Sequence, residues 1–134
     1  IRAIEDYRSR IPNMKIFKNI PRLEFVNLMR IADCMIGNSS AGITEAPLLH
    51  LPVVNIGRRQ QGRLAAENVI FVNHNKKQIM SAVKRACVDK KYKKIVKHCS
   101  NPYGDGKTSQ RVAKILASLK IDEKLMVKKL EFPT

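Results

Sequence analysis

The sequence is poor in aromatic side chains and in acidic residues. Tryptophan does not occur among the 134 residues, and aromatic residues together make up only 5% of them. Stacking platforms for single-stranded nucleic acids therefore have few side chains from which to be built. The chain contains 26 lysine and arginine residues against 11 aspartate and glutamate residues, which gives a formal net charge of +15. This surplus fits an anionic partner, and it fits equally a lysine-rich surface that has no partner.

Long apolar runs and paired cysteines are also missing. No apolar run reaches the roughly 18 residues that cross a bilayer, so we expect no transmembrane helix and no membrane partner. The cysteines are Cys34, Cys87 and Cys99, an odd number at unrelated spacings. This pattern argues against a disulfide framework and favours a reducing, cytoplasmic compartment. None of them belongs to a pair with zinc-ligand spacing, so we expect no metal site and no cofactor.

The chain begins with Ile1-Arg2-Ala3-Ile4, without a methionine or the apolar core of a signal peptide. This start has the pattern of a helix interior, and we expect the chain to be a piece of a longer polypeptide. Apolar residues make up 44% of the chain and charged residues 28%, the balance of a soluble globular protein. The length suits one domain with a core of modest size.

The spacing of apolar residues predicts strands that alternate with helices. Continuous apolar runs, or alternation of apolar and polar residues, predict strands at 14–20, 34–36, 53–56 and 69–72. Recurrence every three or four residues predicts helices at 22–33, 41–50, 79–87, 89–98 and 112–119, the second of them kinked or shortened by Pro47. Such an order predicts an α/β fold, with a Rossmann-like parallel sheet flanked by helices. In this architecture ligands bind beyond the carboxyl ends of the strands.

The first of two unusual loops is Gly37-Asn38-Ser39-Ser40-Ala41-Gly42, between a predicted strand and a predicted helix. Free N–H groups at a helix start, serine hydroxyls beside them and glycines that allow close approach form a site for phosphate. An ordinary helix capped by Ser39 or Ser40 is the alternative. Glu45 would repel a phosphate, but its carboxylate suits the hydroxyls of a ribose. For Glu45 the alternative is a surface residue that favours the helix dipole.

The second unusual loop is Gly57-Arg58-Arg59-Gln60-Gln61-Gly62-Arg63, which follows the next predicted strand. Arginine forks bind phosphate oxygens at two points. Because adjacent parallel strands end at the same edge of a sheet, we expect this loop beside the serine-containing one. A solvated basic loop is the alternative.

Several other patterns carry no chemistry. Gly106-Lys107-Thr108 has the form of the end of a Walker A loop, but Asn101 stands where that motif requires glycine. Neither Ser39 nor Ser40 lies in the Gly-x-Ser-x-Gly pattern of a nucleophile elbow, and no pair of carboxylates suits acid–base catalysis. The basic stretch 89–98 is expected to be a solvated helix face, and a nucleic-acid surface is the alternative.

Taken together, the motifs resemble those of the UDP-N-acetylglucosamine 2-epimerase family. The resemblance runs through Gly37–Pro47, Pro52–Arg63, Glu67–Ile70 and the late loop Pro102–Gly106, and spans about residues 16–119. Asn-Ser-Ser-Ala-Gly and Gly-Arg-Arg-Gln-Gln-Gly-Arg are similar to the hydrolysing branch. The branch that interconverts UDP-sugars usually has Asp-Ser-Gly-Gly and Thr-Glu-Arg-Pro segments instead.

The resemblance implies a fold and a set of site residues. Residues 1–134 would form the C-terminal, UDP-binding half of a GT-B type two-domain fold, with the N-terminal domain absent. Ser39 and Ser40 would bind the diphosphate, Glu45 the ribose hydroxyls, and Arg59 would line the same site. Two further candidates for binding are Ile20, near the uracil through its backbone, and Arg63. The family's catalytic residues lie upstream, so no catalytic residue maps onto this chain.

The implied parent enzyme converts UDP-N-acetylglucosamine to UDP and N-acetylmannosamine, a step toward sialic-acid-type sugars. Relatives that act on diacetamido-sugar nucleotides share the motifs, so the sugar stays open. We expect a UDP-sugar as the small-molecule partner, a homo-oligomer for the intact enzyme, and no catalysis by this chain alone. The alternatives are a domain of a GT-B type UDP-sugar glycosyltransferase, which uses a similar phosphate loop, and a basic nucleic-acid-binding module.

Overall fold

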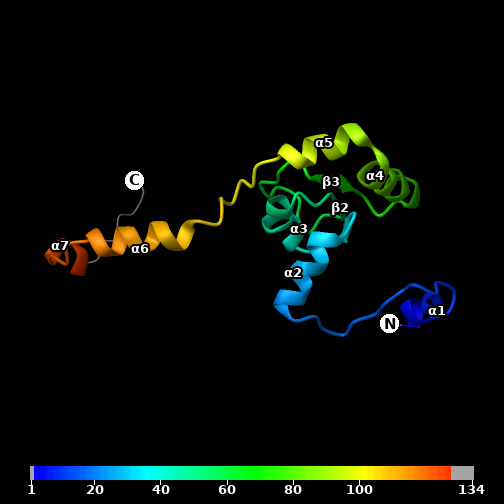
Figure 1. Ribbon diagram of the computed structural model, residues 1–134, viewed down its shortest axis with the longest axis horizontal. Coiled ribbons are helices and arrows are strands. Elements are labelled where there is room, and N and C mark those ends of the chain that lie inside the picture. The colour runs from blue at the N-terminus through cyan, green and yellow to red at the C-terminus, as the bar shows by residue number, and fades with distance from the viewer. Residues whose placement is uncertain (1, 128–134) are drawn as a thin grey trace.

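A parallel sheet lies at the centre of the chain, of which the computed structural model describes residues 2–127 (Figure 1). Strands β1 (Met35–Gly37), β2 (Val53–Ile56) and β3 (Val69–Val72) lie side by side in that order. Met35 pairs with Val53, and Val53 pairs with Val69, so the three strands start in register and run the same way. The predicted α/β, Rossmann-like class is therefore confirmed.

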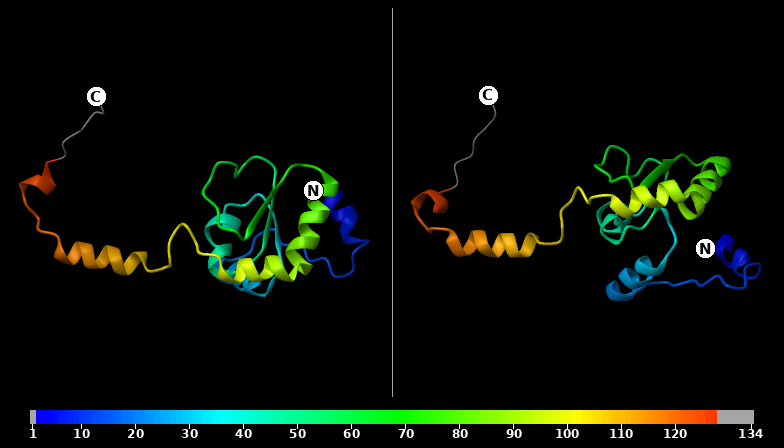
Figure 2. Two further views of the ribbon diagram at one scale, coloured as in Figure 1. Left: turned by 90° about the horizontal axis from the view of Figure 1, so that it is seen from above. Right: turned by 45° about the horizontal axis from the view of Figure 1, so that its top comes forward.

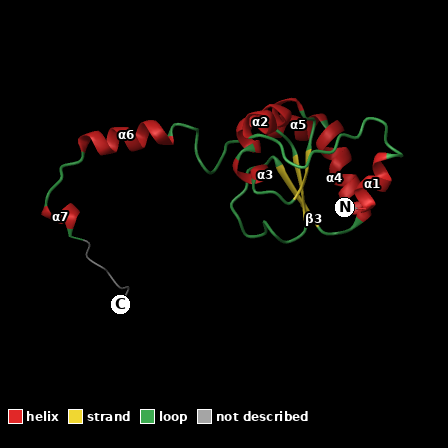
Figure 3. Ribbon diagram, turned by 90° about the horizontal axis from the view of Figure 1, so that it is seen from below, coloured by secondary structure: helices red, strands yellow, loops and turns green. Residues whose placement is uncertain are grey.

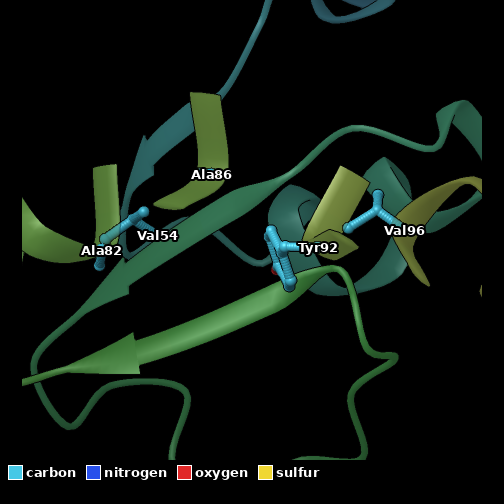
Figure 4. Close-up of a cluster of buried hydrophobic side chains, with 5 residues drawn as sticks. All are labelled: Val54, Ala82, Ala86, Tyr92 and Val96. Carbon is cyan, nitrogen blue, oxygen red and sulfur yellow. The ribbon is translucent and has the colours of Figure 1, made fainter. Parts of the chain in front are cut away.

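Helices cover both faces of this sheet (Figure 3). Successive strand residues point to opposite faces, so the neighbours Val53 and Val54 belong to different cores. Val53 packs with residues of α2 (Arg22–Ile31) and of the 3₁₀ helix η1 (Ala46–Leu49). Val54 packs with residues of α4 (Lys76–Val88) and α5 (Lys90–His98), as Figure 4 shows.

Local capping sets the bounds of the two helices on the second face. The Asn75 side chain accepts a hydrogen bond from the Gln78 N–H and starts α4 at Lys76, earlier than the apolar spacing alone predicts. The Asp89 carboxylate accepts from the N–H groups of Lys91 and Tyr92 and starts α5. Helix α5 buries Tyr92 and Val96 and exposes its lysines, so the predicted basic helix forms with its charged side chains on the surface.

Two predicted elements differ in the structure. Residues 14–20 form a largely exposed, extended segment and no strand, because a strand needs a neighbouring backbone and this segment lies away from the sheet (Figure 1). The predicted helix 41–50 is divided into α3 (Ala41–Thr44) and η1, which contains Pro47 near its start. The disruption expected of Pro47 is thus confirmed, and His50, with φ of 50°, ends the segment in a left-handed conformation.

The terminal helices α1 (Arg2–Arg8), α6 (Thr108–Ser118) and α7 (Glu123–Met126) lie outside the layered core (Figure 2). Helix α6 follows an extended connection, and its apolar residues Val112, Ile115 and Leu116 are all exposed. The predicted helix at 112–119 therefore forms, beginning at Thr108, but adds nothing to the core. No helix within residues 2–127 is long and apolar enough to span a bilayer.

One core side chain carries a buried polar atom without a partner. Tyr92 is 4% exposed, and its hydroxyl finds no hydrogen-bond partner among the described residues. The guanidinium of Arg85 lies 4.9 Å from the centre of its ring. Burial raises the pKa of Tyr92 to about 12, and burial together with the neighbouring Cys87 raises that of Cys34 to about 11. Both groups are neutral when protonated, so folding favours their protonated forms.

Removal of this hydroxyl should stabilise the chain. We expect Tyr92→Phe to raise the free energy of unfolding by about 1 kcal/mol, because the hydroxyl loses its hydration on folding and gains no partner. Urea denaturation at pH 7 measures the change. Tyr103→Phe is the control, since Tyr103 is exposed and its hydroxyl stays hydrated. A loss of stability in Tyr92→Phe would mean that the hydroxyl has a partner in solution.

Stability should also decline in alkaline solution. Since the folded pKa values of Cys34 and Tyr92 lie above their ordinary values of 9.0 and 10.0, their contribution is complete below about pH 9. It is lost as the pH rises toward 12, where both groups ionise in either state. We expect urea midpoints to fall from pH 8.5 to 11.5, and to fall less in Tyr92→Phe. A decline of equal size in both proteins would contradict the assignment to Tyr92.

Candidate functional site

The two unusual loops lie at the same edge of the sheet. The serine loop (37–42) leaves the carboxyl end of β1, and the arginine loop (57–63) leaves the carboxyl end of β2. These strands are paired neighbours with Gly37 opposite Asn55, so their ends are adjacent. This is the edge at which open parallel sheets bind ligands.

The serine loop offers hydroxyls and free N–H groups to solvent. Ser39 and Ser40 are both exposed. The Ser39 hydroxyl accepts from the Ala41 N–H at 3.3 Å, whereas Ser40 occupies the N-cap position without a capping hydrogen bond from its side chain. Helix α3 has only four residues, so its dipole contributes little, and hydroxyls and N–H groups are the main donors of this loop.

Gly42 packs closely against the central strand, a role that the sequence did not predict. It is buried, and a Cβ at this position would lie 2.8 Å from Val53 Cγ1. Only glycine lets α3 come this close to β2. The serine loop is thus set by direct contact between the start of α3 and the central strand.

A buried glutamine joins the two loops. Gln60 is 2% exposed, and its Nε2 donates to the Asn38 carbonyl at 2.9 Å. Its Oε1 accepts from Nη1 of Arg63 at 2.9 Å. The motif in which Gln60 lies is visible in the sequence, but this contact is not, because Asn38 and Gln60 belong to loops that only the fold brings together.

The arginines of the second loop differ in their surroundings. Arg63 is exposed but tied through its guanidinium to Gln60. Arg58 and Arg59 are exposed, and neither side chain makes a hydrogen bond or ion pair with the described residues. Two guanidinium groups therefore remain available to an anion at this edge, together with the remaining donors of Arg63.

Glu45 is paired with an arginine that the sequence analysis did not single out. Its Oε2 accepts from Nη1 of Arg22 in an ion pair, with the Arg22 side chain mostly exposed and that of Glu45 less so. Arg22 is the first residue of α2 and follows Ile20 by two positions. Ile20 itself is half-buried. Because Arg22 pairs with Glu45, the segment that contains Ile20 lies near the helix that follows the serine loop. Pairing also offsets the negative charge that would repel a phosphate.

The described residues include no group of three or more histidine, cysteine, aspartate or glutamate side chains that could hold a metal ion. The candidate residues at this edge supply arginine guanidinium groups, hydroxyls, backbone N–H groups and one paired carboxylate. Such groups are the type that suits an anion carrying hydroxyl groups.

Comparison with known proteins places the chain in a family. The sheet and its flanking helices define a Rossmann-like α/β protein with two polar loops at the carboxyl edge of the sheet. Residues 1–117 match the model of the UDP-N-acetylglucosamine 2-epimerase family. The chain belongs to this family, as the resemblance of its motifs implies.

The chain matches only a part of each curated relative. The chain is 38% identical over 117 residues to a hydrolysing UDP-N,N'-diacetylbacillosamine 2-epimerase of Legionella pneumophila. This match spans 87% of the chain and 30% of that enzyme. It is 41% identical over 63 residues to a UDP-N-acetylglucosamine 2-epimerase of Neisseria meningitidis, and this match spans 47% of the chain and 17% of that enzyme. The chain thus spans about a third or less of the curated relatives it matches.

A solved structure shares the fold. It is a crystal structure from Listeria monocytogenes described as a UDP-N-acetylglucosamine 2-epimerase, similar with a TM-score of 0.71 at 19% sequence identity. The similarity covers 87% of this chain and 33% of that one. At this identity the likeness shows the fold alone.

The contact between Gly42 and Val53 allows a test of how the serine loop is placed. We expect Gly42→Ala to lower the free energy of unfolding by about 1–2 kcal/mol, because the added Cβ overlaps Val53 Cγ1. In a Val53→Ala background, which removes the overlap, the same change should raise stability by up to about 1 kcal/mol through helix propensity. A double-mutant cycle of urea denaturations measures both. Equal effects in the two backgrounds would contradict the close packing.

Proposed function

We propose that the chain is the UDP-binding domain of a hydrolysing UDP-N-acetylglucosamine 2-epimerase, in the C-terminal half of a GT-B type fold. The serine and arginine loops would hold the diphosphate of a UDP-sugar. Similarity to a hydrolysing 2-epimerase of Legionella pneumophila supports the hydrolysing branch. The observation that carries the proposal is the adjacency of the two loops, linked by Gln60, at the edge where such sheets bind ligands.

Each candidate residue has a part in this proposal. The N–H groups and hydroxyls of Ser39 and Ser40 donate to phosphate oxygens, and Arg59 and Arg63 neutralise their charge. Glu45, with Arg22 beside it, accepts hydrogen bonds from the ribose hydroxyls. The backbone near Ile20 lies against the uracil.

The reaction follows from the resemblance. A base from the remaining part of the parent enzyme takes the C2 proton as the C1–O bond to UDP breaks, and this anti elimination gives a 2-acetamidoglucal. Water then adds across the double bond of that intermediate to give N-acetylmannosamine. Negative charge develops on UDP as the glycosidic bond breaks. Preset N–H groups and guanidinium groups stabilise this charge more than that of the ground state, and so speed departure. This role needs no titrating residue from the present chain.

The substrate is a UDP-linked acetamido sugar in this proposal. The curated relatives include enzymes for UDP-N-acetylglucosamine and for UDP-N,N'-diacetylbacillosamine, so the donor set serves the shared UDP moiety. The catalytic carboxylates would come from the remaining part of the parent enzyme, which we propose to be homo-oligomeric and cytoplasmic. The sugar itself would also contact that remaining part.

Titration of the chain with UDP tests the binding site. We expect saturable binding of UDP by calorimetry, weaker binding of UMP, and a loss of about tenfold or more in UDP affinity in Arg59→Ala, because one charge-assisted contact to phosphate is removed. Arg30→Ala is the matched control. It removes the same charge from an exposed position in the last turn of α2, at the opposite end of that helix from Arg22.

Two results would contradict this proposal. Equal losses in Arg59→Ala and Arg30→Ala would indicate general electrostatic attraction and no defined site. Binding of a short DNA duplex that is tighter than UDP binding and falls steeply with salt would favour the nucleic-acid alternative.

A turnover assay tests whether the chain catalyses the reaction without the rest of the parent enzyme. Because the chain supplies only groups that hold the leaving group, we expect it to release no UDP from UDP-N-acetylglucosamine. Coupled detection of UDP measures this, with an intact hydrolysing 2-epimerase as positive control. Release of UDP and N-acetylmannosamine by the chain alone would show that it contains the catalytic residues.

A further inference from the structure

We propose that Gln60 is the positioning residue that joins the serine loop and the arginine loop into one clamp for a diphosphate, and so sets the preference for UDP over UMP. This inference rests on the proposed function, since it assumes that both loops bind the nucleotide. In this proposal Gln60 does not contact the substrate itself. It fixes the positions of the groups that do.

The burial of Gln60 fixes the orientation of its amide. At 2% exposure the amide has almost no access to water, and both of its ends are bonded within the protein. The Nε2 end donates to the Asn38 carbonyl, and the Oε1 end accepts from Arg63. A flipped amide would set oxygen against oxygen and nitrogen against guanidinium, and both contacts would be lost. The side chain therefore has one orientation.

The contact with Asn38 fixes a peptide plane of the serine loop. In a trans peptide the C=O and the following N–H point in opposite directions, so the bond to the Asn38 carbonyl turns the Ser39 N–H away from Gln60. The N–H groups of Ser39 and Ser40 donate no hydrogen bond to any described residue. Both residues are exposed. Gln60 thus orients the Ser39 N–H, a donor that is free to take an anion.

The contact with Arg63 fixes the second side of the clamp. One of the five guanidinium N–H donors is used by Gln60 Oε1 at 2.9 Å, and the others remain for a ligand. A long exposed arginine loses side-chain entropy when it binds a phosphate, and a prior hydrogen bond removes part of that cost. Because the Gln60 amide is bonded to both Asn38 and Arg63, a displacement of one loop displaces the other.

A clamp of this kind distinguishes a diphosphate from a monophosphate. In this proposal the two phosphoryl groups of a diphosphate engage the serine loop and Arg63 together, whereas one phosphoryl group engages one side. Loss of the link should therefore weaken UDP binding and leave UMP binding nearly unchanged. A residue that only supports the fold would reduce both affinities together.

The decisive variants are Gln60→Met and Gln60→Glu. Methionine has a similar length and breaks both hydrogen bonds, whereas glutamate keeps an acceptor for Arg63 and loses the donor to Asn38. Gln61→Met is the matched control, because Gln61 is the next residue, is exposed, and makes no side-chain hydrogen bond with the described residues. We expect the UMP-to-UDP ratio of dissociation constants to fall about tenfold or more in both Gln60 variants and to stay unchanged in Gln61→Met.

Hydrogen–deuterium exchange of the ligand-free chain tests the link without any nucleotide. We expect exchange of peptides covering 37–42 to accelerate several-fold in Gln60→Met, with no change in peptides covering β2 and no change in Gln61→Met. Unaltered exchange at 37–42 would overturn the link between the loops. Faster exchange with an unaltered UMP-to-UDP ratio would overturn the role in specificity.

Absence of UDP binding by the unaltered chain would overturn the proposed function and the clamp with it. The exchange experiment would still decide whether Gln60 holds the two loops together.

Discussion

The central strand β2 is the constraint on which the rest of the structure depends. Val53, Val54 and Asn55 are almost completely buried, because β2 pairs with a strand on each side and is covered by helices on both faces. Pairing with β1 puts the carboxyl ends of the two strands next to each other, and close contact at Gly42 sets α3 against β2. The serine and arginine loops therefore meet as a consequence of how β2 is buried.

The charges of the site are arranged so that positive potential dominates its edge. The carboxylate of Glu45 is paired with Arg22, and Arg63 is held by an uncharged amide, so its charge is not neutralised. Arg58 and Arg59 stay exposed. Ion pairs with exposed partners contribute little to stability, so the value of the Arg22 pair lies in placing groups and in reducing repulsion of an anion.

Several elements could be predicted because their signals are local. The apolar runs at 53–56 and 69–72 coincide with β2 and β3, and Pro47 disrupts its helix as its ring geometry requires. The segment 14–20 shows the limit of such signals, since alternation describes which face a strand would bury and not whether a neighbouring strand exists. In the same way, the apolar stripe of α6 predicted a helix correctly, but not that this helix would lie outside the core.

The sequence by itself determined the order of the elements, the two loops at strand ends and, through its motifs, the family to which the chain belongs. These properties reside in residues close together along the chain. Only the tertiary structure decided that Gln60 joins Asn38 to Arg63, that Arg22 pairs with Glu45, and that Gly42 touches Val53. Apart from the short step from Gln60 to Arg63, these contacts connect residues remote in sequence. Hydrogen bonds and steric contacts act over a few ångströms, so the fold alone decides which remote residues come within that range.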